Sequence, residues 1–391
     1  MEAYIVKGYR SAIGKAKKGG FRNYRSDDLA VDVIKHLMFA VPEIDPKTVD
    51  DVIVGCANPE GEQGLQIGRL ISARALGKEA PGVTINRYCA SGLEAIAQAV
   101  AKIKAGFGEI YIAGGIESMS MIPMTGYKLA PSYKANIENI NYHVSMGHTA
   151  EAVSDKYGIT REAADQFAFD SHRKAAAAID AGKFDEQIVP VKVEDVFVKD
   201  GKKVTSSHTV AMDEGVRRDT TLEGLAKLRP VFKKGGVVTA GNASQTSDGA
   251  AFTLVVSEVV VKALNLEPVA RLAACAVGGV EPLYMGIGPC IAIPKALKQA
   301  DLKLSDIEQT ELNEAFAAQA LAVIQEAGLN PETVNVNGGA LALGHPLGCT
   351  GAKLSIQLLE EMKLRKQRYG MVTACVGGGQ GIAGIFERLK E

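Results

Sequence analysis

Short apolar and β-branched runs alternate with longer amphipathic segments in the first part of the chain. The short runs predict strands at residues 4–8, 51–55, 82–86 and 109–114. From Ser91 to Ile103 the apolar residues recur at spacings of three and four, which predicts a helix. Ser91 and Glu94 have the spacing of a capping box that would begin this helix. The alternation is typical of a layered α/β fold.

The pattern changes between residues 119 and 247 and then returns. This middle stretch is rich in Met and Tyr, and it contains a charged helix predicted at residues 161–181 and a polar loop predicted at 200–207. After residue 268 we predict a strand at 333–337, a helix at 351–362 and a strand at 370–376. We therefore expect an N-terminal α/β half formed by residues 1–118 and 248–267, an inserted loop domain at 119–247, and a C-terminal α/β half at 268–391.

The two predicted halves share an order of features. In each, a strand ending in an asparagine, Asn86 or Asn337, leads to a turn, an amphipathic helix and a strand that runs into glycines. A solenoid would require a shorter and more regular period. The pattern indicates two related halves.

Composition and charge exclude several classes of protein. The 44 basic and 45 acidic residues give a net charge of −1, so we expect no nucleic-acid partner. The sequence has neither a run of 18 apolar residues nor a leader pattern, and its end is no peroxisomal address. We expect a soluble, cytoplasmic protein without a membrane span. The six cysteines form no CxxC pair and the six histidines no HExxH motif, which favours free thiols and no metal site.

Cys89 is the first candidate for chemistry. It lies in the segment NRYCASG, residues 86–92, on the turn between a predicted strand and a predicted helix. The positive end of the helix dipole is expected to lower the pKa of this thiol and favour a nucleophilic thiolate. The alternative is a small buried hydrophobic residue without a chemical role.

Three further segments carry candidate groups. His345 lies in the glycine-dense segment NGGALALGHPLGCTG, residues 337–351, where glycines allow close approach of a ligand. Asn313 begins NEAFA, residues 313–317, either as a helix N-cap or as an amide that orients a water or substrate oxygen. Cys375 begins CVGGGQG, residues 375–381, whose bare amides could line an oxyanion site.

Residues 379–384 match GxGxxG, the pattern of a dinucleotide-binding turn. No acidic residue follows at the required distance, so we reject a dinucleotide-binding fold.

Together, NRYCASG, NEAFA, NGGALALGHPLGCTG and CVGGGQG resemble the signatures of the thiolase family, over nearly the whole chain. The resemblance implies a five-layered αβαβα fold of two related halves with an inserted loop domain. It also implies a coenzyme A thioester as ligand, coenzyme A as co-substrate and no prosthetic group. In this family homodimers or homotetramers are expected, and a β-oxidation multienzyme partner is possible.

The resemblance assigns roles to the candidates. Cys89 would be the nucleophile that attacks a 3-ketoacyl-CoA after His345 takes its proton. His345 and a water held by Asn313 would form a first oxyanion hole, and the amides of Cys89 and Gly377 a second. Cys375 would be the second acid and base.

Other residues resemble the family's coenzyme A site. Arg217 is similar to an adenine-side arginine. Ser244, in the segment GNAS at 241–244, is similar to a serine that contacts pantetheine, and Met146, Met285 and Phe316 are similar to pocket walls. Ordinary packing or a solvated charge is the alternative for each.

Two features favour the degradative branch of the family, which acts on 3-ketoacyl-CoA in fatty-acid β-oxidation. Ser145 stands where the biosynthetic branch usually has a histidine, and the segment EQGL at 62–65 is more similar to the degradative branch. The biosynthetic acetyl-CoA acetyltransferase remains the alternative. A ketoacyl synthase would have a histidine in place of Cys375, and a purely structural subunit would not require Cys89, His345 and Cys375 together.

Overall fold

The computed structural model describes residues 1–389, so residues 390–391 of the predicted C-terminal half lie outside it. The strands are β1 (Ala3–Ser11), β2 (Gly14–Lys15), β3 (Asp51–Cys56), β4 (Gly82–Ile85), β5 (Ile110–Ser118), β6 (Ile188–Val189), β7 (Val191–Lys199), β8 (Lys202–Val210), β9 (Ser247–Ser257), β10 (Ala270–Gly279), β11 (Gln309–Leu312), β12 (Tyr369–Val376) and β13 (Gln380–Arg388). The helices are α1 (Ser26–Phe39), α2 (Ile67–Ala75), α3 (Ser91–Lys104), α4 (Tyr133–Glu138), α5 (Met146–Tyr157), α6 (Arg161–Asp180), α7 (Leu222–Ala226), α8 (Glu258–Leu264), α9 (Gly288–Ala300), α10 (Ala317–Ala327), α11 (Ala340–Leu343) and α12 (Leu347–Arg365).

Strands from both halves join in one strongly curved array. Its order is β11-β12-β13-β10-β1-β9-β5-β3-β4. The halves meet where β1 pairs with β10, through a single register pair of Ile5 with Ala270. The pairs β3–β4, β3–β5 and β11–β12 are parallel, as strands connected by helices require. The array can therefore be described as two sheets, one from each half, that are joined at the single β1–β10 register pair.

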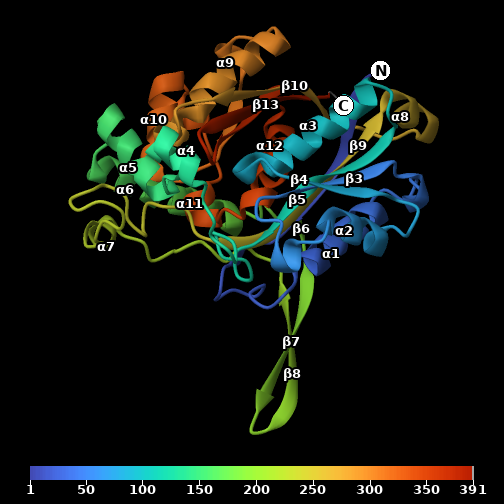
Figure 1. Cartoon of the computed structure of the whole chain (residues 1–391). Coiled ribbons are helices and arrows are strands. Elements are labelled where there is room, and N and C mark those ends of the chain that lie inside the picture. The colour runs from blue at the N-terminus through green and yellow to red at the C-terminus, as the bar shows by residue number, and fades with distance from the viewer. Residues whose placement is uncertain (390–391) are drawn as a thin grey trace.

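The helices form three layers around these two sheets. The central layer is α3 and α12, which lie side by side between the sheets (Figure 1) and share one buried core with strands from both halves. Helices α1 and α2 cover the outer face of the N-terminal sheet, and α9 and α10 cover that of the C-terminal sheet. Two outer helix layers, two sheets and one central helix layer give the predicted αβαβα order.

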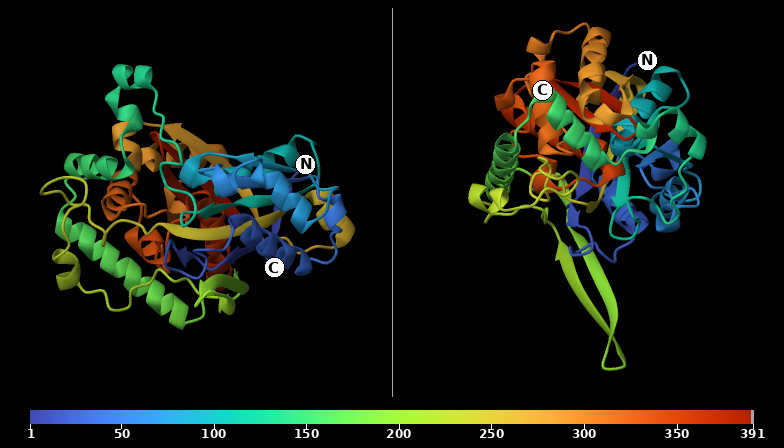
Figure 2. Two further views of the ribbon diagram at one scale, coloured as in Figure 1. Left: turned by 60° about the horizontal axis from the view of Figure 1, so that its bottom comes forward. Right: turned by 60° about the vertical axis from the view of Figure 1, so that its left-hand side comes forward.

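The segment between β5 and β9 lies across one side of this body. It holds α4 to α7 and a long hairpin of β7 and β8 that projects from the body in Figure 1 and in the right view of Figure 2. The predicted polar loop at 200–207 is wrong, because these residues form the hairpin's turn and β8. Asp200 and Gly201 both have positive φ, 51° and 74°, and Asp-Gly is a preferred hairpin turn.

Three other predicted elements can be compared with the helices and strands of the structure. The helix predicted at 161–181 is α6, and the helix predicted at 351–362 lies within the longer α12. The strand predicted at 333–337 is wrong: Pro331–Thr333 is a short 3-10 helix, and Asn335 has a left-handed φ of 47° that ends any extended run. The strand next to β12 is instead β11, which precedes NEAFA.

Candidate active site

The N-terminal turns of α3 and α12 touch each other at glycines. A Cβ atom on Gly92 would lie 2.6 Å from the amide nitrogen of Ala352, and a Cβ on Gly351 would collide with the backbone of Leu93. The two central helices therefore approach backbone to backbone at this point. This contact brings together the turns that precede the helices, which carry Cys89 and His345.

Cys89 lies in a short 3-10 helix, Tyr88–Ala90, directly before α3. Tyr88 adopts a left-handed φ of 43°, and its amide donates to Asn86 Oδ1 at 2.8 Å. The thiol is nearly fully buried, and the nearby backbone amides of Cys89 and Gly377 are the two donors that favour its ionised form. Burial raises its pKa to about 12 despite these two donors. The expectation of a lowered pKa is therefore wrong for this resting structure, because desolvation outweighs the helix end.

The predicted capping box is also wrong. Ser91 is the first residue of α3, and its hydroxyl accepts from the Arg87 amide at 2.9 Å and donates to the Tyr88 carbonyl at 2.7 Å. The Glu94 carboxylate pairs with Arg87 Nε at 2.8 Å. Both side chains therefore hold the turn around Cys89.

Cys375 is the penultimate residue of β12, and its thiol lies near that of Cys89. Its side chain is fully buried in a cluster with Met285 and Ala315, against which Met146 and Phe316 pack. Burial raises the pKa of the Cys375 thiol, and the neighbouring Cys89 raises it further. The two thiols are thus close enough for the charge of one to disfavour ionisation of the other.

His345 is held on both ring nitrogens. Nδ1 lies 2.6 Å from Thr350 Oγ1, and Nε2 lies 3.3 Å from Asn313 Nδ2. Burial lowers the pKa of His345 to about 3, and the cationic Lys353 adds to the shift. The imidazole is therefore neutral, as a proton acceptor must be.

Asn313 is not the helix N-cap that the sequence also allowed. Helix α10 begins at Ala317, with Phe316 in the cap position. The amide of Asn313 is fully buried, and its Oδ1 has no hydrogen-bond partner among residues 1–389. A buried acceptor without a protein partner fits the alternative that this amide orients a water or a substrate oxygen.

A buried carboxylate connects the Cys89 side of the site to the His345 side. Glu117, at the end of β5, accepts hydrogen bonds from the amides of Ala57 and Gly348, both at 2.9 Å, and from Gln63 Nε2 at 2.7 Å. Leu347, beside Gly348, packs against Cys89 in one buried cluster. Glu117 therefore fixes the start of α12 against the N-terminal half.

The residues predicted to bind coenzyme A fall into two places. Ser244 lies beside the Cys375 cluster, because its amide donates to the Ala315 carbonyl at 2.9 Å. Arg217 lies elsewhere: its amide donates to His172 Nδ1 at 3.1 Å, and it lines a cavity of about 260 Å³ with Arg173 and other α6 residues. The structure thus groups Ser244 with the pocket walls and leaves Arg217 outside that group.

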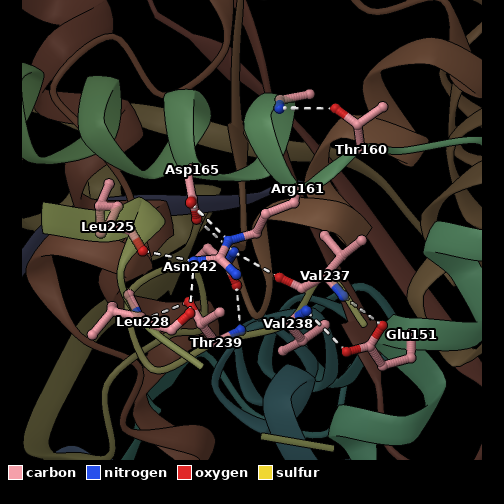
Figure 3. Close-up of polar contacts among 12 residues, drawn as sticks. Glu151, Thr160, Arg161, Asp165, Leu225, Leu228, Val237, Val238, Thr239 and Asn242 are labelled. Atoms are coloured by element: carbon pink, nitrogen blue, oxygen red, sulfur yellow. Dashed lines mark hydrogen bonds and ion pairs between the residues drawn. The ribbon is translucent and has the colours of Figure 1, made fainter. Parts of the chain in front are cut away.

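A polar network holds the loop that leads to Ser244 (Figure 3). Asp165 on α6 binds Arg161 Nε at 2.7 Å and Asn242 Nδ2 at 2.8 Å, and Arg161 donates to the carbonyls of Leu225 and Leu228. The Glu151 carboxylate on α5 accepts from two amides of the same loop, at 2.9 Å each. Helices α5 and α6 therefore fix this loop.

Two residues of the site escaped the sequence analysis. Thr350 follows His345 by five residues, a spacing that places it in the first turn of α12 under the imidazole. Glu117 is an acidic residue at the end of a strand that is buried throughout, and such a charge requires partners. An acidic residue within an otherwise apolar strand can be recognised from the sequence alone, and it would have indicated Glu117.

No helix among residues 1–389 is long and apolar enough to cross a membrane. In the same residues, His, Cys, Asp and Glu side chains form no group of three that could hold a metal ion.

Comparisons with known proteins cover nearly the whole chain. The family model described as "Thiolase, N-terminal domain" matches residues 3–259, and that described as "Thiolase, C-terminal domain" matches residues 266–388. The chain is 50% identical over 388 residues to a 3-ketoacyl-CoA thiolase of Bacillus subtilis, covering 99% of each protein. It is 44% identical to the peroxisomal 3-ketoacyl-CoA thiolase 2 of Arabidopsis thaliana, covering 99% of this chain and 84% of that protein. A crystal structure of the Bacillus anthracis acetyl-CoA acetyltransferase superposes with a TM-score of 0.87 at 39% identity, covering 99% of both chains.

Proposed function

Because the chain belongs to the thiolase family and has the fold predicted from its sequence, we propose that it cleaves 3-ketoacyl-CoA with coenzyme A. The products are acetyl-CoA and an acyl-CoA shortened by two carbons. Thiolases are acyltransferases that use coenzyme A as co-substrate without a prosthetic group, and this chain is an enzyme of that class. The degradative direction belongs to fatty-acid β-oxidation.

The observation that carries the proposal is the environment of the Cys89 sulfur. The amides of Cys89 and Gly377 both donate to it, and Cys375 lies beside it. An oxygen bonded to the carbon that Cys89 attacks would lie within reach of the same two donors. We infer a catalytic role because packing alone does not require two thiols and two amide donors at one buried point.

The first half of the reaction forms an acyl-enzyme. His345 Nε2 takes the proton of Cys89, and the thiolate attacks the 3-keto carbon. The C2–C3 bond breaks, and its electron pair leaves as the enolate of acetyl-CoA. His345 and a water held by Asn313 stabilise the enolate oxygen, and the Cys375 thiol gives its proton to the enolate carbon.

The second half transfers the acyl group. The Cys375 thiolate takes the thiol proton of incoming coenzyme A, whose sulfur attacks the acyl-Cys89 thioester. The amides of Cys89 and Gly377 stabilise the tetrahedral oxyanion, the Cys89 thiolate leaves, and it takes back the proton that His345 received in the first half. In reverse, the same groups perform a Claisen condensation.

The inserted segment supplies the coenzyme A site in this proposal. We assign residues 119–247 to it, between an N-terminal half of residues 1–118 and 248–267 and a C-terminal half that starts at 268. Contact of Ser244 with the Ala315 carbonyl supports its role beside pantetheine, and packing around Cys375 supports Met146, Met285 and Phe316 as pocket walls. Arg217 keeps its proposed adenine-side role from the resemblance alone.

The biosynthetic acetyl-CoA acetyltransferase is the second candidate, favoured by the likeness to the B. anthracis structure. Higher identity to proteins named 3-ketoacyl-CoA thiolase favours the degradative reaction. Ser145 stands at the N-cap position of α5 without a capping side-chain hydrogen bond, and its hydroxyl lies 2.7 Å from His148 Nδ1.

Thiolysis of acetoacetyl-CoA beside 3-ketohexadecanoyl-CoA separates the two candidates. The loss of enolate absorbance is followed with purified protein, and Cys89→Ala serves as the blank. Faster cleavage of the long substrate supports the degradative reaction. Cleavage of the four-carbon substrate alone, with condensation of acetyl-CoA in reverse, supports the biosynthetic one.

A homodimer or homotetramer and a β-oxidation multienzyme partner stay predictions from the resemblance. The cytoplasmic location and the lack of a nucleic-acid partner stay predictions from the sequence.

A further inference from the structure

The surroundings of His345 specify which of its two nitrogens carries the proton. Thr350 is almost fully buried in the first turn of α12, with its Oγ1 2.6 Å from His345 Nδ1 and 2.8 Å from the Pro346 carbonyl oxygen. A hydroxyl has one proton to donate, and a carbonyl oxygen can only accept. Both contacts are hydrogen bonds only if the hydroxyl donates to Pro346 and accepts from a protonated Nδ1.

We propose that Thr350 is a positioning residue that fixes His345 in the Nδ1–H tautomer and so leaves the lone pair of Nε2 free to take a proton. This inference deepens the proposed thiolysis and rests on it for its catalytic meaning. The tautomer itself is a property of the resting protein. It can therefore be measured whether or not the substrate has been identified correctly.

Asn313 supports the same tautomer from the other side of the ring. Its Nδ2 group, 3.3 Å from His345 Nε2, can only donate, so the contact requires an unprotonated Nε2. The opposite tautomer would require the Asn313 amide to turn over and the Thr350 hydroxyl to give up the Pro346 carbonyl. Two separate contacts would thus have to change together.

The backbone of the His345 turn is held independently of Thr350. The His345 amide donates to Ser247 Oγ at 3.1 Å and to the Gln245 carbonyl at 3.3 Å, and Ser247 Oγ donates in turn to that carbonyl. Loss of the Thr350 hydroxyl therefore removes one of the two contacts that select the tautomer and leaves the backbone contacts of the turn in place.

A hydroxyl differs from the carboxylate that often orients a catalytic histidine. It selects the tautomer without adding a negative charge that would stabilise an imidazolium. The charged group that perturbs His345 is the cationic Lys353. The ring therefore stays a neutral base until it receives a proton.

The test compares Thr350→Val, Thr350→Ser and the unchanged protein, each labelled with ¹⁵N-histidine. Two-bond ¹H–¹⁵N spectra distinguish a protonated ring nitrogen from an unprotonated one, and His345→Gln assigns the signal. We expect a protonated Nδ1 in the unchanged protein and in Thr350→Ser, and a substantial Nε2–H population in Thr350→Val. Thr253→Val is the matched control, because Thr253 is a fully buried threonine whose hydroxyl binds only the Ala113 carbonyl.

Kinetics provide the second readout. General-base catalysis is typically worth 10²–10⁴-fold, so partial loss of the correct tautomer should lower kcat of Thr350→Val by about 10-fold to 100-fold. KM should change by less than about threefold, and Thr350→Ser should restore kcat. A loss in Thr253→Val of the same size as in Thr350→Val would mean that only packing was disturbed, and would overturn the proposal.

The outcomes separate this inference from the proposed function. Protonated Nε2 in the unchanged protein, or an unchanged tautomer with unchanged kcat in Thr350→Val, overturns the role of Thr350. If Thr350→Val does not fold, the spectra of the unchanged protein and of Thr350→Ser still decide the tautomer. Absence of thiolysis by the unchanged protein, with Nδ1 protonated as expected, overturns the proposed function and leaves the tautomer assignment supported.

Discussion

The turn before α3 and the turn before α12 occupy matching places in the two halves but hold their reactive groups differently. Backbone amides, those of Cys89 and Gly377, are the donors to the Cys89 sulfur. His345 is held by side chains, Thr350 and Asn313, one on each ring nitrogen. In the proposed mechanism, the nucleophile Cys89 thus sits among donors suited to a developing oxyanion, and the base His345 is oriented by groups that fix its proton.

The difference follows from what each group must do. A thiol that becomes acylated has to tolerate a new substituent, and amide donors remain in place when the side chain changes. An imidazole that accepts a proton on one nitrogen needs the other nitrogen occupied. The two related halves therefore provide similar turns, but the residues around each turn suit a different step of the proposed reaction.

The largest effect is expected for loss of the nucleophile. Cys89→Ala should lower kcat/KM for thiolysis by about 10⁴-fold or more, because the covalent step is lost. Initial rates of loss of enolate absorbance measure it. Cys290→Ala is the control, since this partly buried thiol on α9 packs in the outer core of the C-terminal half, and its loss should leave activity unchanged. Thiolysis by Cys89→Ala at a rate near that of the unchanged protein would exclude Cys89 as nucleophile.

Reactivity of the resting thiol should follow its raised pKa. With a pKa of about 12, Cys89 is mostly protonated from pH 7 to pH 10, and its thiolate fraction grows about tenfold per pH unit. Alkylation of Cys89 by iodoacetamide, read by peptide mass spectrometry, should therefore rise about 1000-fold over this range without a plateau. Glutathione is the control, and it should level off near pH 9. A plateau of Cys89 at or below pH 9 would mean that the amides outweigh burial.

The contribution of the side chains around the His345 imidazole to catalysis is tested by replacing Asn313. Asn313→Ala should lower kcat by about 10²–10³-fold, the usual loss for one oxyanion donor, with KM changed by less than about threefold. Steady-state kinetics over a range of substrate concentrations separate the two constants. Asn330→Ala, an exposed asparagine that caps a short 3-10 helix, is the control. A rise in KM alone would place Asn313 in substrate binding only.

The contact between the two turns is tested at Gly92. Gly92→Ala should lower the free energy of unfolding by about 1–3 kcal/mol, because the added Cβ meets the backbone of Ala352. Urea denaturation followed by circular dichroism measures it. Gly279→Ala adds the same atom where no neighbour lies within 4 Å and should change stability by less than about 0.5 kcal/mol. Equal stability of the two variants would show that the helices separate without penalty.

Much of the site could be predicted from the sequence because its residues lie in local signatures. Strand, turn and helix around Cys89 follow from apolar spacing, and the glycines near His345 indicate a close approach of backbone. Local pattern was less reliable where a long-range partner decides the structure. The strand expected at 333–337 is absent because Asn335 has a left-handed φ, and Val334 forms an isolated bridge with Thr310 of β11. Residues 202–207, expected in a loop, pair with β7 as part of β8.

The sequence by itself determined the layered α/β class and the family, and it led to the proposal of three reactive side chains, because each depends on residue type and spacing. Only the tertiary structure decided how those groups behave. Burial raises the pKa of Cys89, and Thr350 and Asn313 select the proton position on His345. These effects arise from desolvation and from hydrogen bonds that form only when the chain folds, and a one-dimensional pattern carries no record of either.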